Sequence, residues 1–355
     1  MSPTASGQPP ASQTDAPQFE SDPAKGRDFR EISVHPNGEE LLFVECSRAL
    51  EPAGGCYVLR YHLTRKSLQR YVLPEQYFYT SASFSPQGNY VVMSRVPRHD
   101  SDQESVQHAY DKTEIALMKS DGTEFGILQL AKGPKVGPNI SLDGRRVAYW
   151  RAALRKPASR TFSNNFDVWE MNLSTGEDRL FAGPFLFYER DGLQYLSQDE
   201  MVVGAYGPVA FLRQHAQSMT TYDKKYNRSG VYRFSRGAAL LPEPICTEVE
   251  GAKIPSIDKD GNVYFYGQRP GISLFKRSMD GHIKQWVKPQ DIGGISSMVA
   301  SSDGLSILFT YHVRGTQPRE AKEGMGMLDT SASGWKAIDI PSLERSDTIP
   351  VMMTK

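Results

Sequence analysis

The stretch ISLDGRRVAY at residues 140–149 decides the fold, because two apolar runs meet in it at a tight Asp143-Gly144 turn. Glycine reaches the positive φ that such a turn needs, and a preceding Asp or Asn tolerates the same region and hydrogen-bonds its own backbone. The pattern predicts two antiparallel strands joined by a short turn. Comparable turns recur at residues 35–38 (HPNG), 85–88 (SPQG), 258–261 (DKDG) and 301–304 (SSDG), with a degenerate copy at 196–200 (LSQDE).

Each copy opens a unit of roughly 40–55 residues, in which a second pair of apolar runs follows the first. Four strands per repeat are typical of a β-propeller. Continuous apolar runs such as YVVM at 90–93 indicate strands buried between neighbouring sheets. We therefore predict an all-β, six-bladed propeller with four antiparallel strands per blade over residues 29–343. A disordered Ser/Pro/Gln-rich lead precedes it at 1–28, and a C-terminal tail at 344–355 could close the ring as a strand.

The repeated run of an apolar residue, Ser, any residue, Asp-Gly and a second apolar stretch resembles the WD40-like (PD40) repeat of TolB-type propellers. Five of the six units show it whole or in part. The resemblance implies a TolB-like six-bladed fold and says little about chemistry, since such propellers serve as binding platforms, as enzymes and as appendages of peptidases. The chain departs from TolB in lacking an α/β domain before the repeats. It departs from the prolyl oligopeptidase relatives in lacking room for a hydrolase domain.

The balance of charge argues against nucleic acid as the partner, because Lys and Arg number 41 and Asp and Glu also number 41. No apolar run approaches about 18 residues, so we expect no membrane insertion. The N-terminal lead lacks the apolar core of a secretory signal, so we expect a cytoplasmic protein as the sequence stands. We also expect a monomer. A trimmed chain or a non-classical leader would instead place it in the periplasm or outside the cell. Cys46 and Cys56 flank a loop between paired strands, where a disulfide and two reduced thiols are both open.

The predicted binding surface is the face that carries the connections between the second and third strands of the blades. Three of these connections are long, at residues 96–113, 152–166 and 206–229. Basic residues lie at or just beyond the ends of the second strands, where they would suit a small anionic ligand or an acidic protein, although ordinary solvated loop charge explains them too. The predicted ligand- or partner-binding residues are Arg95, Arg151, Arg155, Arg269, Arg314, His312 and, from two aromatic clusters, Tyr79 and Tyr188.

The two tyrosines belong to segments 77–79 and 185–188, which we interpret as connections between blades. On the same face they could anchor a partner, because aromatic side chains are enriched at interface hot spots. Packing between blades is the alternative for each ring.

Sequence motifs for catalysis are absent. No Gly-x-Ser-x-Gly elbow and no His-x-x-x-His pair occurs, so no catalytic residue and no cofactor is predicted. The candidate metal ligands are His99, Asp102 and His108, which crowd one connection of the second blade. We expect a non-catalytic propeller that binds a protein or other macromolecule through the long connections. The alternative is a propeller-type lyase or hydrolase that acts on an anionic saccharide with a metal and Arg and His residues.

Overall fold

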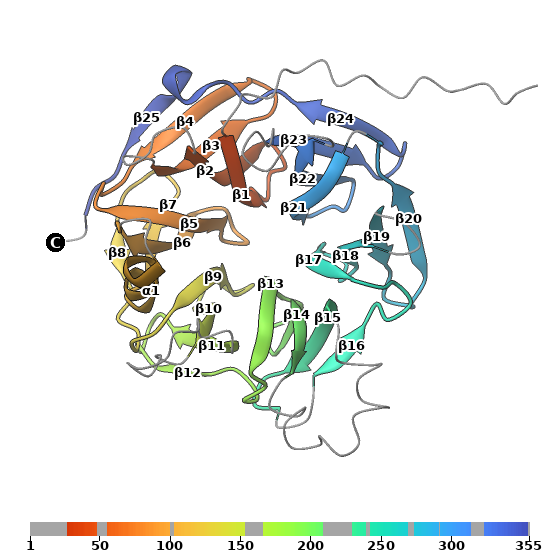
Figure 1. Cartoon of the computed structure of the whole chain (residues 1–355), viewed down its shortest axis with the longest axis horizontal. Helices are drawn as coiled ribbons and strands as arrows, with labels where there is room; N and C mark the ends of the chain where they lie inside the picture. Colours follow the sequence, from red (N-terminus) through yellow and green to blue (C-terminus); the bar gives the residue numbers. More distant parts are fainter. Residues whose placement is uncertain are drawn as a thin grey trace, which may run out of the picture.

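Six four-stranded antiparallel sheets stand around a ring, and the chain visits them in sequence order (Figure 1). The computed structural model describes residues 27–47, 55–99, 103–152, 166–208, 229–238, 242–268, 273–290, 292–313 and 323–353. The predicted fold class, an all-β six-bladed propeller, is confirmed. The predicted lead lies outside the described residues, except that Arg27 and Asp28 already belong to the first strand. None of the described segments forms a helix of the length and hydropathy needed to cross a membrane.

Each blade uses one continuous stretch of chain and is numbered from its innermost strand outward. Blade 1 is β1 (Arg27–Val34), β2 (Glu40–Ser47), β3 (Cys56–His62) and β4 (Ser67–Val72); blade 2 is β5 (Tyr77–Phe84), β6 (Tyr90–Pro97), β7 (Glu114–Lys119) and β8 (Gly126–Ile127); blade 3 is β9 (Lys135–Ile140), β10 (Arg146–Ala152), β11 (Phe166–Asn172) and β12 (Asp178–Leu180). Blade 4 is β13 (Phe187–Tyr195), β14 (Glu200–Pro208), β15 (Ser229–Ser235) and β16 (Glu243–Ile245); blade 5 is β17 (Lys253–Ile257), β18 (Val263–Gly267), β19 (Ser273–Arg277) and β20 (Ile283–Val287); blade 6 is β21 (Ile292–Ala300), β22 (Ser306–Val313), β23 (Glu323–Asp329) and β24 (Gly334–Ile338).

Among the described residues, three further elements lie outside this pattern. Helix α1 (Gln103–Asp111) interrupts the connection between β6 and β7, and a short 3-10 helix, η2 (Leu343–Arg345), precedes the last strand, β25 (Asp347–Pro350). A single pairing between Phe166 and Phe187 also joins the sheets of blades 3 and 4.

The repeated turn closes through its own side chains. Ser141 Oγ donates to Asp143 Oδ1 at 2.6 Å and accepts from the backbone N–H of Arg146 at 2.9 Å, while Gly144 takes φ +73°. In blade 6 the turn repeats this geometry, since Ser301 Oγ donates to Asp303 Oδ1 at 2.6 Å. The Ser-x-Asp-Gly pattern is therefore a local hydrogen-bond motif that fixes where the first hairpin of a blade reverses.

The core lies between adjacent blades. The second strands are buried on both sides, as the continuous apolar runs predicted, and Trp150 and Tyr149 of β10 point into different clusters on opposite faces of their sheet. One buried carboxylate in this layer is paired with groups of the next blade. Glu170 of β11 is 2% exposed and accepts a hydrogen bond from Tyr195 Oη of blade 4 at 2.8 Å, and it also bonds Arg236.

Serine hydroxyls join the innermost strands of neighbouring blades. Ser256 Oγ of β17 accepts from the backbone N–H of Ala300 in β21 at 2.9 Å. Ser297 Oγ of β21 accepts in the same way from Ile32 of β1 at 3.0 Å. Ser33 Oγ continues the series into blade 2, where the donor is the backbone N–H of Phe84. These bonds give buried amide groups an acceptor that no strand partner supplies.

The predicted ring-closing tail pairs with blade 1. Strand β25 runs parallel to β4, the outermost strand of that blade, as Figure 1 shows at the rim of the ring. The chain then reaches blade 2, where Met353 bridges Phe125. Blades 1 and 6 themselves meet through side chains, because Arg27 donates to the carbonyl oxygen of Ile340 at 2.9 Å and Glu323 accepts from the backbone N–H of Phe29 at 2.9 Å.

Two predicted connections are shorter than expected. Residues 77–79 begin β5, and Phe187 and Tyr188 begin β13. Aromatic residues favour extended backbone, so the inner strands extend by these residues. The extended backbone pairs with the ends of β6 and β14.

Candidate binding surface

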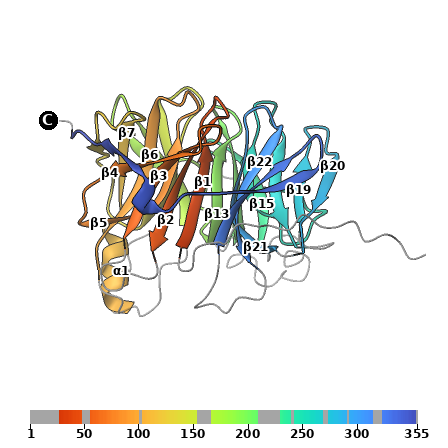
Figure 2. The ribbon, with the colours of Figure 1, turned by 90° about the horizontal axis from the view of Figure 1, so that it is seen from above.

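The second strands of the blades end, and the third strands begin, on one face of the ring, which we name the long-loop face. Helix α1 stands out from this side of the molecule (Figure 2). The opposite face carries the repeated Gly turns. Three of the predicted binding residues, Arg95, Arg151 and His312, lie at the ends of second strands on this face.

Arg95 lies near the end of β6 and is almost fully buried. Its guanidinium pairs with the carboxylate of Glu114, at 2.7 Å, on the neighbouring strand β7. The same guanidinium stacks over the ring of Tyr77 at 3.7 Å from the ring centre. The charge of Arg95 therefore has an acidic partner inside its own blade.

Arg151 holds the equivalent place in blade 3. Its guanidinium stacks over Trp169 at 4.0 Å and lies 3.7 Å from a carboxylate oxygen of Asp178. Tyr149 Oη donates to the other oxygen of Asp178 at 2.6 Å, and both burial and this carboxylate raise the pKa of Tyr149. The Nη1 atom of Arg151 is buried and makes no hydrogen bond. This arginine is less satisfied than Arg95.

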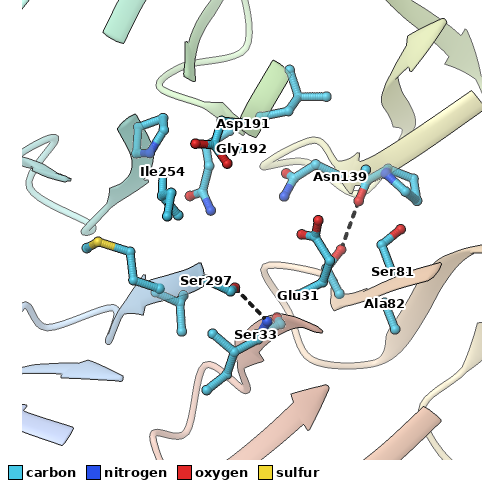
Figure 3. A pocket seen from close by; sticks show the side chains of 18 of the residues that line it. Glu31, Ser33, Ser81, Ala82, Asn139, Asp191, Gly192, Ile254 and Ser297 are labelled. Carbon is cyan, nitrogen blue, oxygen red and sulfur yellow. Dashed lines mark hydrogen bonds between the residues drawn. The ribbon is translucent and has the colours of Figure 1, made fainter. Parts of the chain in front are cut away.

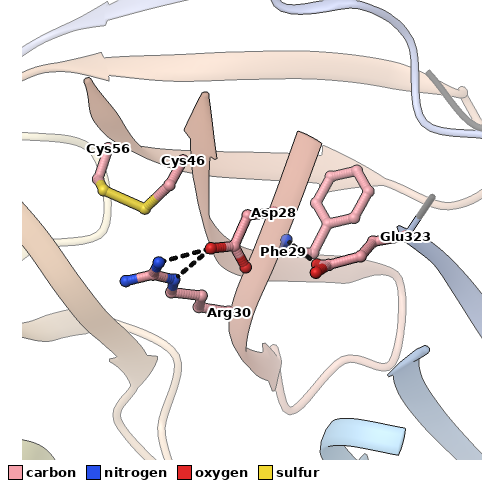
Figure 4. The surroundings of a disulfide bond; sticks show 6 residues. All are labelled: Asp28, Phe29, Arg30, Cys46, Cys56 and Glu323. Atoms are coloured by element: carbon pink, nitrogen blue, oxygen red, sulfur yellow. Dashed lines mark hydrogen bonds and ion pairs between the residues drawn. A yellow bond between two sulfur atoms is a disulfide. The ribbon is translucent and has the colours of Figure 1, made fainter. Parts of the chain in front are cut away.

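His312 lies at the end of β22, beside the mouth of the central channel. Its Nδ1 atom is 3.2 Å from Glu323, whose other carboxylate oxygen accepts from the backbone of Phe29. Arg30 and Asp28 lie close by on β1 and form an ion pair, with Nε and Oδ2 2.9 Å apart (Figure 4). The imidazole is half-exposed and the carboxylate beneath it is buried. Glu323 therefore joins blade 6 to blade 1, because it contacts His312 in its own blade and the backbone of Phe29 in the next.

Several predicted residues fall outside the described part of the chain. The backbone of Tyr188 belongs to β13, but its side chain is not among those described. Arg155, Arg269, Arg314 and the candidate metal ligand Asp102 also lie outside the described residues.

Tyr79 packs between blades 1 and 2. Its ring is 3% exposed within the cluster that the two blades share, and its hydroxyl donates to the carbonyl oxygen of Pro74 at 3.3 Å. Burial raises the pKa of this phenol to about 12. Because Tyr79 is almost fully buried, its position supports a role in packing between the two blades.

A different aromatic group is accessible on the long-loop face. The guanidinium of Arg98 lies over the ring of Phe78 at 5.2 Å, and the same ring makes an edge contact with His99, with the ring centres 5.4 Å apart. Tyr110 of α1 adds a third ring, with its centre 6.5 Å from that of His99. We name Phe78, Arg98, His99 and Tyr110 the α1 cluster. The sequence did not predict this cluster, because His99 and Tyr110 are brought together only by the path of the connection that holds α1.

The candidate metal ligands that are described do not form a cluster. His99 contacts aromatic rings, and His108 is exposed in the last turn of α1. Within the described ranges, no three His, Cys, Asp or Glu residues lie close enough together to hold an ion.

The six innermost strands, which surround the central channel, each carry a β-bulge or register shift. Left-handed backbone accompanies four of these irregularities, at Glu31, Gly137, Gly192 and Ile254. A cavity of about 110 Å³ lies at this level, and Figure 3 shows its polar lining. The charged side chains that line it are the carboxylates of Glu31 and Asp191.

Cys46 and Cys56 form a disulfide (Figure 4). They lie directly opposite each other in the pairing of β2 and β3, at the long-loop face. Of the two alternatives left open by the sequence, the structure shows the disulfide. Cys246 is free and buried, and burial raises the pKa of its thiol well above the usual range.

Comparisons with known proteins bear on the fold. No protein-family model and no curated protein matches this sequence. Among solved structures, TolB from Acinetobacter baumannii matches at a TM-score of 0.57 and 14% identity, over 94% of this chain and 68% of that one. The tricorn protease matches at 0.57 and 11%, over 90% of this chain, which spans only 27% of the protease.

The β-propeller domain of the Trilobed protease from Pyrococcus furiosus, described as having an open velcro topology, matches at a TM-score of 0.53 and 14% identity. It is similar in extent, since 89% of this chain covers 96% of that domain. The resemblance to TolB-like propellers is confirmed as a likeness of fold. At these identities it carries no information about activity.

Proposed function

We propose that this chain is a non-catalytic propeller that binds a protein partner through its long-loop face. The observation that carries the proposal is the α1 cluster, in which Arg98, Phe78, His99 and Tyr110 gather beside an inserted helix. Arg and aromatic side chains are the residue types that dominate binding energy at protein interfaces. Insertions on a rigid scaffold are where binding residues concentrate.

The chemistry of the cluster favours a partner with acidic and apolar groups. Arg98 is exposed and is anchored by a hydrogen bond from its Nε to the carbonyl oxygen of Glu75. This bond leaves other guanidinium donors for a carboxylate of the partner. The rings beside it provide apolar contact area at low conformational cost.

Capture of a partner by variants of the full chain tests the proposal. Arg98→Glu should abolish capture, because it reverses the charge in the centre of the cluster. Arg65→Glu is the matched control, since Arg65 is exposed in the turn between β3 and β4 on the opposite face. A partner that both variants retain equally would contradict the proposal. The comparison uses variants that melt within about 1 °C of the wild type, so that loss of capture reflects the surface and not unfolding; retained capture by folded Arg98→Glu contradicts the proposal.

The alternative, a propeller-type lyase or hydrolase, makes a different prediction. Stoichiometric divalent metal in elemental analysis of the purified protein would favour it.

We further propose that the protein works in an oxidising compartment, which is the periplasmic or extracellular alternative. The Cys46–Cys56 disulfide supports this, because structural disulfides persist in such compartments and are rare in the cytosol. Thiol trapping in intact cells tests the location, since two reduced thiols at these positions would contradict it.

A further inference from the structure

A second cavity lies on the long-loop face, at the boundary between blades 2 and 3. Its volume is about 620 Å³, which is within the range of small-molecule sites. It is open to the surface and is lined by the start of β5, the ends of α1 and β6, the start of β7, residues 127–132 and the start of β9. It is therefore distinct from the central channel.

One end of this cavity is built around a buried cation. Lys135, the first residue of β9, is 5% exposed and lines the cavity. Its ammonium group donates to the carbonyl oxygen of Gly133 at 2.6 Å. Arg151 lies directly opposite Lys135 in the pairing of β9 with β10, and its buried Nη1 atom makes no hydrogen bond. Two positive groups thus adjoin, and Asp178, 3.7 Å from Nη1, is the acid beside Arg151.

The nearby acids are already engaged. Glu114, which lines the cavity, is bound by Arg95 at 2.7 Å. Asp178 accepts a hydrogen bond from Tyr149 and adjoins Arg151. Burial and the neighbouring Arg151 lower the pKa of Lys135 to about 8, against the weaker opposing effect of Asp178 and Glu114. A buried ammonium is costly unless it is paired, and here its neighbours supply too little negative charge.

The remaining walls are partly apolar. Ile127, Leu128 and Leu130 line one side, and Tyr77 and Pro97 line another. Lys112 and Lys132 add positive charge among the exposed lining residues, where Asp111 is the one further acid.

We propose that this cavity binds a small amphipathic carboxylate, with the carboxylate against Lys135 and the apolar body against Ile127, Leu128 and Leu130. The carboxylate supplies the negative charge that Lys135 lacks, through charge-assisted hydrogen bonds. The apolar walls then favour a carboxylate with a hydrophobic body over a bare anion. This site involves no residue of the α1 cluster and does not depend on a protein partner.

Three probes separate the contributions: benzoate, its neutral isostere benzamide, and acetate. Ligand-observed NMR on the full chain should show benzoate binding at least tenfold more tightly than either of the other two. Equal binding of benzoate and benzamide would show an apolar cavity with no charge recognition and would overturn the proposal. Equal binding of benzoate and acetate would show an anion site without the apolar component and would overturn it as well. Failure of benzoate to bind at millimolar concentration would also overturn it.

Variants then locate the site. Lys135→Gln should weaken benzoate binding at least tenfold, and Lys336→Gln, an exposed lysine on β24, should not change it. Lys135→Met serves as a second variant if the glutamine form is unstable, because it fills similar volume without a buried polar group. If both folded Lys135 variants bind benzoate like the wild type, the site is elsewhere and the proposal is wrong. These probes need no partner, so a failed capture experiment on Arg98 leaves the result unaffected.

Discussion

Replacing Ser256 with alanine removes the acceptor that joins blade 5 to blade 6. Ser256 is fully buried and its Oγ atom accepts from the backbone N–H of Ala300, which is 5% exposed. Alanine leaves that amide in a dry position without an acceptor. A buried donor left unsatisfied costs about 1–3 kcal/mol, so we expect the free energy of unfolding to fall by that amount.

This loss can be measured as a change in melting temperature. The entropy of unfolding is about 2 cal/mol/K per residue, which for a chain of this length corresponds to roughly 1.5 °C per kcal/mol. Circular dichroism should therefore show Ser256→Ala melting about 1.5–4.5 °C below the wild type. A urea titration should show a lower midpoint with an unchanged slope, because the surface exposed on unfolding is the same.

Ser296→Ala is the matched control. Ser296 is exposed, and its hydroxyl bonds only within blade 6, to Thr310 Oγ1 at 3.1 Å. Its loss should stay within about 0.5 kcal/mol. If Ser256→Ala is as stable as Ser296→Ala, the inter-blade hydroxyl does not stabilise the ring as argued.

Denatured protein purified without reductant should contain one reactive thiol, that of Cys246, because Cys46 and Cys56 are joined; three reactive thiols would contradict the disulfide. Glu170→Gln should lower the free energy of unfolding by about 3 kcal/mol in urea, because it breaks a buried charge pair that links blades 3 and 4, and a loss below about 1 kcal/mol would show that the charge is not needed. Between pH 8 and about 10 the wild type should gain stability relative to Lys135→Gln, because the folded pKa of Lys135 is about 8 and the unfolded value is about 10.4, so the unfolded chain binds more protons in that window. A stability difference that does not change over this range would refute the lowered pKa.

The sequence predicted the blades because their determinants are local. A serine two residues before an aspartate, followed by glycine, closes its turn through contacts spanning five residues or fewer, as at Ser141 and Ser301. Such a motif can be recognised from the sequence without any knowledge of the rest of the fold. The same holds for continuous apolar runs, whose burial on both faces follows from strand geometry.

The partners of side chains could not be predicted in this way. Arg95 lies near a strand end, as expected, but its pairing with Glu114 depends on the register between β6 and β7 across a long connection. Lys135 was overlooked because its burial depends on the packing of blade 3 against blade 2. The place of β25 beside β4 was also undecided, since a short apolar tail can pair with several exposed strand edges.

The irregularities in the six innermost strands belong to the backbone, so they fix the frame around the central cavity. Bulges at Glu31, Gly192 and Ile254 lie in strands whose side chains line this cavity, so replacing a lining side chain that needs no special backbone changes its chemistry and leaves the frame in place. A designer could exchange the acidic lining for a basic or apolar one and retain the same frame.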